Sequence, residues 1–332
     1  MITFSKERIK RLFADFKNQK IVVVGDLMLD RYIWGSVSKI SPEAPVPVVE
    51  VQRESHRFGG AANVVNNVQT LGAHVFPVGI LGQDSGGELL TALFKKQDLS
   101  VDGLICESQR KTTIKTRIIA HNQHVVRIDR EIKSAVSKKT QDKIVSLLKD
   151  HLNDADCLIL EDYNKGLLTP RLIENIINLA RNKKVKILVD PKFDNFFAYK
   201  NTTLFKPNKK ETADKLGIKL QTEEDILHAG EKLQQRLNCK AVLITLGEQG
   251  MILIDKGKEP FTIPTKAVKV HDVSGAGDTV IATMAVLIAA GANYREAATI
   301  SNYAAGIVCG EVGIVPINYD NLLYIMLSNA DA

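Results

Sequence analysis

Short apolar segments rich in β-branched residues alternate along this chain with longer amphipathic segments. The short segments are predicted strands, and the longer ones show the 3.6-residue period of helices. Because parallel strands need crossover connections of a dozen or more residues, this alternation favours a mostly parallel sheet covered by helices. The predicted strands are 21–24, 74–79, 157–160, 186–189, 203–205 and 241–245, and the predicted helices are 60–71, 86–97, 137–152, 170–182, 209–216 and 223–237.

Two regions, residues 31–51 and 112–130, interrupt the alternation. Each is predicted to contain consecutive strands with no helix between them. Polar and apolar residues alternate on both sides of 121–123, which predicts a hairpin there. Prolines in the first region restrict it to edge-type pairing. We therefore expect one domain over residues 1–332, with an α/β body and a small β-sheet that projects from it as a lid.

Composition and charge exclude several classes of protein. The chain of 332 residues can bury a large core, and its net charge of +6 comes from scattered Lys and Arg residues. Because like charges form no block of five or six, no nucleic-acid partner is expected. The longest apolar run, around 280–292, is too short for a membrane span, and the charged N-terminus is not a signal peptide. The four cysteines form no zinc motif, and we expect a cytoplasmic protein.

Two common phosphate-binding motifs are absent from the sequence. There is no G-x-x-x-x-G-K-[ST], so the chain is not a P-loop enzyme. The first predicted strand continues into Gly25-Asp26-Leu27-Met28 instead of G-x-G-x-x-G, which argues against a dinucleotide-dependent dehydrogenase.

The stretch Gly275-Ala276-Gly277-Asp278 precedes an apolar segment predicted as a helix over 280–290. The first turn of a helix leaves about four N–H groups unpaired and carries partial positive charge, so it attracts phosphate. Small residues let the backbone approach such an anion closely, and an acid on the same turn is within reach of the attacking group. The combination suits phosphoryl transfer, although Asp is also an ordinary capping residue at a helix start.

Polar residues near the strand ends indicate the rest of a site, because parallel strands place their carboxyl ends at one edge of the sheet, where open α/β sheets bind ligands. The residues expected at that edge are Gly25, Asp162, Asp190, Asn208 and Gly247. Asp30 and Asn63 can bind sugar hydroxyls, and the Gly59-Gly60 pair allows a close approach. Helix packing by the glycines, and capping or solvation by Asp30, are the structural alternatives.

Two more stretches follow later strands. Asn208 and Glu211 have the spacing of a capping box, and they are equally placed to bind Mg²⁺ through its retained waters. The stretch Thr245 to Gly250 is an unspecific glycine turn by itself, but beside a phosphate site it could hold ATP through backbone contacts.

Together and in this order, these motifs resemble the ribokinase-like (PfkB) family of carbohydrate kinases over nearly the full chain. The resemblance is carried by Gly59–Asn63, Gly82-x-Asp84, Asn208-x-x-Glu211 and, above all, Gly275–Asp278. Within the family, the chain is most similar to the kinases for D-glycero-D-manno-heptose 7-phosphate. The stretches behind this likeness are 25–32, 40–48, 122–123 with 127–129, and 190–192.

The resemblance implies a ribokinase-like fold with a β lid through which two protomers often join, together with ATP, Mg²⁺ and a monovalent cation such as K⁺. It implies that Asp278 is the catalytic base and that Gly275, Ala276 and Gly277 hold the transferring phosphoryl group. The residues implied on the sugar side are Asp30, Gly59, Gly60 and Asn63, with Arg117, Arg127 and Lys192 as candidates for the 7-phosphate. The residues implied for the nucleotide are Asn208, Lys209, Lys210, Glu211, Thr245, Gly247, Gly250 and Asn302, and those for metals are Asp272 and Glu211.

The sequence departs from the family's pattern in two places. Gly313-Ile314 stands where Gly-Thr is expected near the end of the cation loop, 309–313. The bifunctional members carry a C-terminal nucleotidyltransferase domain that this chain is too short to include. We therefore expect a stand-alone kinase or a fragment, working with a separate nucleotidyltransferase.

Three functions are compatible with the sequence. The first is phosphorylation of the heptose 7-phosphate at its anomeric hydroxyl, in the biosynthesis of ADP-heptose for lipopolysaccharide. The second is a kinase for another sugar or sugar phosphate, such as ribose or fructose 1-phosphate. The third is a sugar-binding protein that has lost catalysis, which the intact Asp278 and its two glycines disfavour.

Overall fold

The computed structural model describes residues 4–121, 123–266 and 270–330, and its body is built on one large sheet. The strands of this sheet are β1 (Lys20–Gly25), β4 (His74–Gly82), β5 (Leu104–Glu107), β8 (Cys157–Glu161), β9 (Lys186–Asp190), β10 (Leu204–Phe205), β11 (Ala241–Thr245), β12 (Met251–Asp255) and β13 (Phe261–Ile263). Their order is β13-β12-β11-β10-β9-β8-β1-β4-β5. All neighbours from β11 to β5 are parallel, whereas β12 and β13 pair antiparallel.

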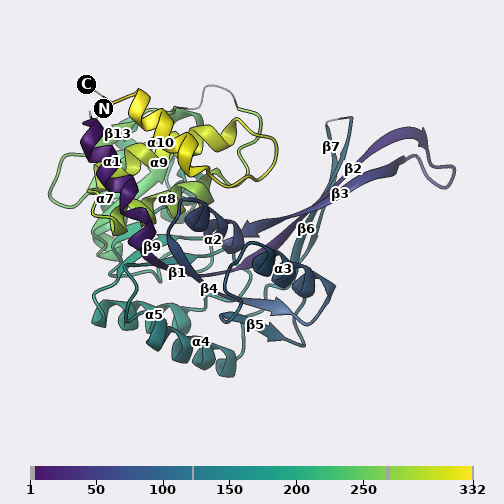
Figure 1. Cartoon of the computed structure of the whole chain (residues 1–332), viewed down its shortest axis with the longest axis horizontal. Coiled ribbons are helices and arrows are strands. Elements are labelled where there is room, and N and C mark those ends of the chain that lie inside the picture. The colour runs from purple at the N-terminus through teal and green to yellow at the C-terminus, as the bar shows by residue number, and fades with distance from the viewer. Residues whose placement is uncertain (1–3, 122, 267–269, 331–332) are drawn as a thin grey trace.

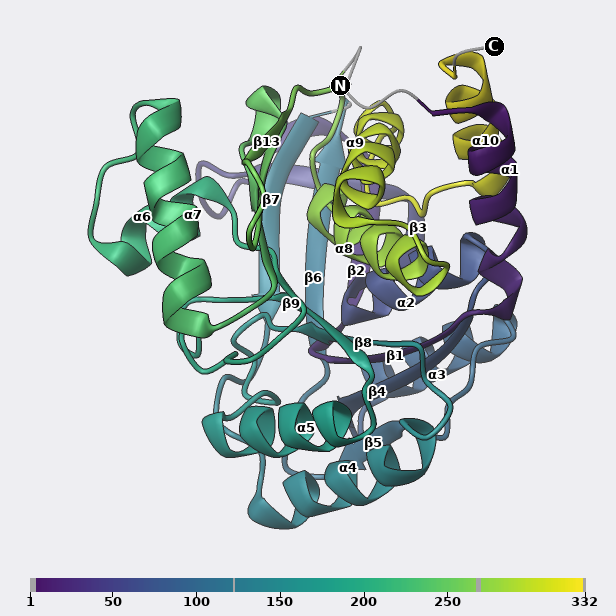
Figure 2. The ribbon, with the colours of Figure 1, turned by 90° about the vertical axis from the view of Figure 1, so that its left-hand side faces the viewer.

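Helices cover both faces of this sheet (Figure 2). One face packs against α1 (Lys6–Ala14), α2 (Ala61–Thr70), α3 (Ser85–Lys96), α8 (Ala276–Ala289), α9 (Tyr294–Cys309) and α10 (Tyr319–Ser328). The other packs against α4 (Lys138–His151), α5 (Pro170–Asn182), α6 (Lys209–Leu216) and α7 (Glu223–Leu237). Short 3₁₀ turns occur at η1 (Phe16–Asn18) and η2 (Gly247–Gln249). None of the helices in the described part of the chain is long and apolar enough to cross a bilayer.

Every strand and helix predicted from the alternation is present. The helix predicted over 280–290 begins earlier, at Ala276, because its N-cap residue Gly275 has a positive φ of 82° and turns the chain directly into the helix. Asp278 therefore belongs to the first helical turn itself. All side chains from Asp278 to Ile288 are buried, which is expected of a helix that is apolar on every side.

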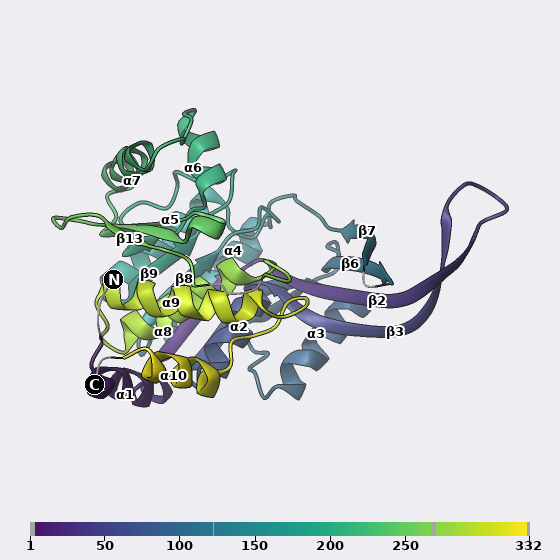
Figure 3. The ribbon, with the colours of Figure 1, turned by 90° about the horizontal axis from the view of Figure 1, so that it is seen from above.

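A second sheet of four strands projects from the body (Figures 1 and 3). It contains β2 (Leu27–Ile40), β3 (Pro47–Gly60), β6 (Thr113–Ala120) and β7 (Gln123–Arg130), in the order β3-β2-β6-β7. The predicted hairpin is confirmed because β6 and β7 pair antiparallel up to Ala120 and Gln123, although Asn122 lies outside the described residues. Strands β2 and β3 extend beyond the predicted region 31–51 at both ends. β2 starts at Leu27, only two residues after β1 ends, and β3 continues to Gly60.

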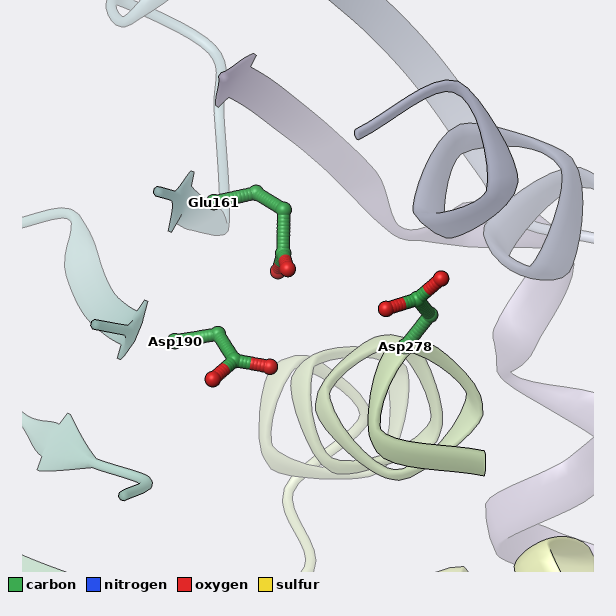
Figure 4. A group of neighbouring side chains, drawn as sticks. All are labelled: Glu161, Asp190 and Asp278. Carbon is green, nitrogen blue, oxygen red and sulfur yellow. The ribbon is translucent and has the colours of Figure 1, made fainter. Parts of the chain in front are cut away.

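The carboxyl ends of the central strands lie together at one edge, as the sequence predicted. Gly25 of β1 pairs with Glu161 of β8, and Glu161 pairs with Asp190 of β9. Further along the edge, Asn208 forms a parallel bridge with Thr245. This register places polar groups from distant parts of the chain in one row, and the first turn of α8 faces that row (Figure 4).

Candidate active site

Asp278 is 3 % exposed, and donors from two other elements hold its carboxylate. Asn63 of α2 donates through Nδ2 to Asp278 Oδ2 at 2.8 Å. The hydroxyl of Tyr163, in the segment after β8, donates to Asp278 Oδ1 at 2.7 Å. The carboxylate is thus fixed in one orientation beside the unpaired N–H groups of a helix start. This arrangement places an acid next to a backbone that favours anions.

Burial raises the pKa of Asp278 to about 6, because removal from water disfavours the charged carboxylate. The hydrogen bonds from Asn63 and Tyr163 favour the charged form and lower the pKa, but they only partly offset the burial. Nearby Asp190 raises the pKa further, and the Lys206 ammonium lowers it. A carboxyl group with this pKa is mostly ionised at neutral pH and can accept a proton.

Positions 275 and 277 are occupied by glycine for different structural reasons. A Cβ atom on Gly275 would lie 2.9 Å from Asn63 Nδ2, and the positive φ of Gly275 would be strained for any other residue. At Gly277 a Cβ atom would meet no atom closer than Lys206 Nζ, at 3.5 Å. Packing therefore requires Gly275, whereas Gly277 leaves the helix start open toward the Lys206 ammonium. That opening is suited to an anion.

Tyr163 was not predicted from the sequence, and its position depends on Asp26, a buried acid directly after β1. Asp26 Oδ2 accepts hydrogen bonds from the backbone N–H groups of Tyr163 and Lys165, at 2.9 and 3.0 Å. Asp26 therefore holds the segment after β8 in place, and this segment presents the Tyr163 hydroxyl to Asp278. The sequence contains no signal for this contact between Asp26 and the backbone after β8.

A group of buried acids surrounds the space next to Asp278 (Figure 4). Glu161 and Asp190, which end β8 and β9, each offer a carboxylate oxygen, and these atoms and one of Asp278 lie within 4.8 Å of one another. Burial raises the pKa of both Glu161 and Asp190. Lys206 Nζ lies 2.6 Å from Asp190 Oδ2 and lowers the pKa of that carboxyl in part. Asp190 was expected at this edge, whereas Glu161 and Lys206 were not predicted.

A cleft of about 620 Å³ opens beside Asp278. Its walls include the whole turn Gly275–Asp278 and Lys192. The residues expected to bind the nucleotide all line the same cleft: Asn208, Lys209, Lys210, Glu211, Thr245, Gly247, Gly250 and Asn302. The fold therefore brings the predicted phosphate turn and the predicted nucleotide residues to one place.

The expected capping box at the start of α6 is confirmed. Asn208 N–H donates to Glu211 Oε2 at 2.9 Å, and Glu211 N–H donates to Asn208 Oδ1 at 2.8 Å. The other oxygen of Glu211 accepts from Lys192 Nζ at 2.6 Å. Burial by itself would lower the pKa of Lys192, but the carboxylates of Asp190 and Glu211 outweigh it and raise the pKa, so this ammonium stays charged. Lys192, expected near the sugar phosphate, thus lies among the residues expected to bind the nucleotide.

The residues expected on the sugar side lie where the second sheet meets the body. Asp30 is 1 % exposed and forms an ion pair with Arg117 Nη1. Gly59 leaves room for the Asp30 carboxylate, which a Cβ atom there would strike. Gly60, with a positive φ of 54°, is the N-cap of the helix that carries Asn63. The exposed Arg127 of β7 pairs with Asp129 instead and does not join the other residues.

Asp272, expected near a monovalent cation, lies between the phosphate turn and the end of α9. Its Oδ1 accepts from Ser274 N–H at 2.9 Å. The adjacent His271 N–H donates to Cys309 O at 2.8 Å, which holds this segment against the start of the 309–313 loop. The two segments expected to surround the cation are therefore neighbours.

A family model described as "pfkB family carbohydrate kinase" matches residues 18–318. The chain belongs to this family, and its class is that of a carbohydrate kinase. Its curated relatives include proteins named "Bifunctional protein HldE" from Desulfatibacillum aliphaticivorans, 41 % identical over 307 residues, and from Aliarcobacter butzleri, 42 % identical over 307 residues. Both alignments cover 92 % of this chain but only 63 % and 64 % of the relatives, so the chain spans less than two thirds of their length.

Solved structures support the fold class. Ribokinase from Arabidopsis thaliana, complexed with ribose and ATP, has a TM-score of 0.74 at 20 % identity, covering 93 % of this chain and 98 % of that one. Phosphofructokinase-2 from Escherichia coli, in complex with potassium, has a TM-score of 0.76 at 18 % identity, covering 94 % and 99 %. These likenesses confirm the predicted ribokinase-like α/β fold, with its mostly parallel sheet flanked by helices and its smaller second sheet.

Proposed function

We propose that this kinase transfers the γ-phosphoryl group of ATP to the anomeric hydroxyl of D-glycero-D-manno-heptose 7-phosphate. The product would be heptose 1,7-bisphosphate, a precursor of ADP-heptose for lipopolysaccharide. The stretches 25–32, 40–48, 122–123 with 127–129, and 190–192, which resemble those of heptose 7-phosphate kinases, support this substrate, as do relatives named HldE. A kinase for another sugar or sugar phosphate is the alternative.

The observation that carries the proposal is the buried Asp278 on the first turn of α8, beside a cleft lined by the nucleotide residues. Asp278 accepts the proton of the sugar hydroxyl while that oxygen attacks the γ-phosphorus. The bond from this phosphorus to the β–γ bridging oxygen breaks, and ADP leaves. Positioned general bases contribute about 10²–10⁴-fold to such steps. The amides of the Gly275–Asp278 turn stabilise the charge on the phosphoryl group.

Residues of the cleft fit the cofactors that the family implies. Lys192 and Lys206 offer ammonium groups for phosphate oxygens, and Glu211 with Asn208 offers oxygens for the waters of a nucleotide-bound Mg²⁺. That ion would neutralise phosphate charge. A monovalent cation such as K⁺ would lie between Asp272 and the 309–313 loop and would support the phosphate turn. On the sugar side, we assign Asn63 and the Asp30–Arg117 pair to the heptose phosphate.

We also propose that the whole chain is one kinase domain that acts in the cytoplasm, with the four-stranded sheet as its lid. Apolar side chains that are exposed on this sheet favour its pairing with a second copy in a homodimer. They include Ile40, Val51, Val125, Val126 and Ile128, and Val46 is exposed in the loop between β2 and β3. The nucleotidyltransferase step would come from a separate protein or from a further part of a longer chain.

The decisive experiment is the Asp278→Asn substitution. Asn keeps the volume of the side chain, and the Tyr163 hydroxyl can turn to accept from its amide. We expect phosphorylation of the heptose 7-phosphate, followed by phosphorus NMR of the product, to fall about 10²–10⁴-fold. Activity above a few per cent in the folded variant would refute the base assignment. A panel of sugar phosphates with the wild-type enzyme tests the substrate, since faster turnover of another sugar would favour the alternative.

A further inference from the structure

Glu161 is the most deeply buried acid of the site for which the proposed reaction gives no role. It is 1 % exposed, and its Oε2 has no hydrogen-bond partner among the described residues. Its side chain extends from the end of β8 toward Asp190 and Asp278 (Figure 4). Burying a polar atom without a partner costs free energy, and burying a charge costs much more unless a counter-charge is near. Such an oxygen is therefore expected to have a ligand that belongs to the site.

The cations around Glu161 are already engaged with other acids. Lys206 pairs with Asp190 at 2.6 Å, and Lys192 pairs with Glu211 at 2.6 Å. Asp278 is held by two neutral donors, which direct hydrogen bonds to it but supply no positive charge. When all three acids are ionised, the cluster therefore combines three buried carboxylates with one directly paired ammonium. This imbalance favours an additional cation in the space that the three carboxylates share.

The geometry suits a divalent ion bound by oxygen atoms. One oxygen from each of the three carboxylates lies within 4.8 Å of the others. Opposite ligands of Mg²⁺ are about 4.2 Å apart, and those of Ca²⁺ about 4.6–5.2 Å apart, as twice their usual bond lengths. Carboxylates with this spacing can reach one ion with small side-chain movements or through a retained water. An all-oxygen set is typical of Mg²⁺, Mn²⁺ and Ca²⁺.

We propose that Glu161, Asp190 and Asp278 form a divalent-metal site that binds its ion without nucleotide. This site differs from the nucleotide-bound Mg²⁺ near Glu211, because it uses carboxylates at the ends of β8 and β9 and on α8. It does not depend on which sugar the enzyme phosphorylates. The site is built by the strand register that aligns Glu161 with Asp190 and by the helix start that faces them.

The test is a titration of the nucleotide-free, chelator-treated protein with Mn²⁺, followed by electron paramagnetic resonance. We expect one tightly bound Mn²⁺ per chain that excess Mg²⁺ displaces. Glu161→Gln should weaken binding by about tenfold or more, since even indirect partners of a metal are worth about 10–100-fold. Glu248→Gln, which removes another acid of the cleft outside the cluster, should leave binding unchanged.

Two outcomes would overturn the proposal. One is the absence of any bound Mn²⁺ in the wild-type protein without nucleotide. The other is Mn²⁺ binding that survives Glu161→Gln but is lost in Glu211→Gln, which would place the ion at the capping box. If Glu161→Gln does not fold, crystals of the nucleotide-free wild type soaked in Mn²⁺ decide instead. An anomalous peak between Glu161, Asp190 and Asp278 supports the site, and a peak elsewhere, or none, refutes it. Since no sugar is used, failure of the heptose assignment leaves this result intact.

Discussion

Replacing Tyr163 by phenylalanine removes one hydroxyl group from the candidate base and little else. That hydroxyl donates to Asp278 Oδ1 at 2.7 Å. The aromatic ring, which the Lys192 ammonium approaches to 5.3 Å from the centroid, is retained in phenylalanine. The pKa of Tyr163 itself is raised well above its usual value, chiefly by burial, so its hydroxyl keeps its proton and acts as a donor at every working pH. The substitution therefore isolates the hydrogen bond to the base.

The size of the effect follows from that hydrogen bond. A hydrogen bond to a charged group contributes about 1.5–3 kcal/mol, and one pKa unit corresponds to about 1.4 kcal/mol, so its loss should raise the pKa of Asp278 by about one to two units. From a starting pKa of about 6, the ionised fraction at pH 7 falls from about nine-tenths to about half or about one-tenth. A bound cation lowers the pKa of Asp278 in the wild type and in Tyr163→Phe alike. The prediction is therefore the difference between the two pKa values, not either value by itself.

The assay is kcat/KM for the sugar phosphate over about pH 5 to 9, whose acidic limb reports the free enzyme's base. In Tyr163→Phe we expect that limb to move to higher pH and the rate to recover at alkaline pH. Tyr199→Phe is the matched control, because the Tyr199 hydroxyl also donates to a carboxylate, at 2.6 Å, but to that of Asp162. An unchanged limb in Tyr163→Phe, or an equal loss of rate at every pH, would refute the reasoning.

Two further predictions concern the same cleft. The pKa of Asp278 is raised from 3.8 to about 6, chiefly by burial, so its charge costs folding free energy above pH 6, and this cost disappears as the pH falls below 3.8. Urea unfolding in metal-free buffer should therefore show Asp278→Asn more stable than wild type at pH 8 by up to about 3 kcal/mol, with a smaller difference at about pH 5. Lys192→Met should raise KM for ATP about tenfold or more by removing a charge-assisted contact to phosphate. Lys258→Met, in the exposed turn after β12, should leave this KM unchanged, and equal KM values in the two variants would contradict the assignment.

Much of the fold could be predicted because its signals are local. Apolar runs and amphipathic periods identified the parallel sheet and most helices, and the capping box at Asn208 and Glu211 needs only residues three apart. The strands β5, β12 and β13 and the helices α1, α9 and α10 were not predicted. β12 follows β11 through a short glycine turn that was interpreted as an unspecific turn or an ATP contact, without a strand after it. The antiparallel pairing of β12 has no counterpart in the strand–helix alternation.

The internal contacts of the site could not be predicted in the same way. Tyr163 and Asp278 are 115 positions apart in the chain, and Asn63 and Asp278 are 215 apart. No local pattern marks such pairs, because they form only when the loop held by Asp26 and the start of α2 close on the first turn of α8. The orientation of Glu161 depends likewise on the register between β8 and β9.

The sequence by itself determined the alternating architecture, the phosphate turn and its acid, since periodicity, glycine and helix-end chemistry act over a few residues. Tertiary structure alone decided how charges are paired. It placed Lys192 with Glu211, Asp30 with Arg117, and Lys206 with Asp190. It also left the buried oxygen of Glu161 without a hydrogen-bond partner in the described part of the chain. The physical reason is that burial and ion pairing depend on distances in space, which the chain sets only after the sheet and its helices have packed.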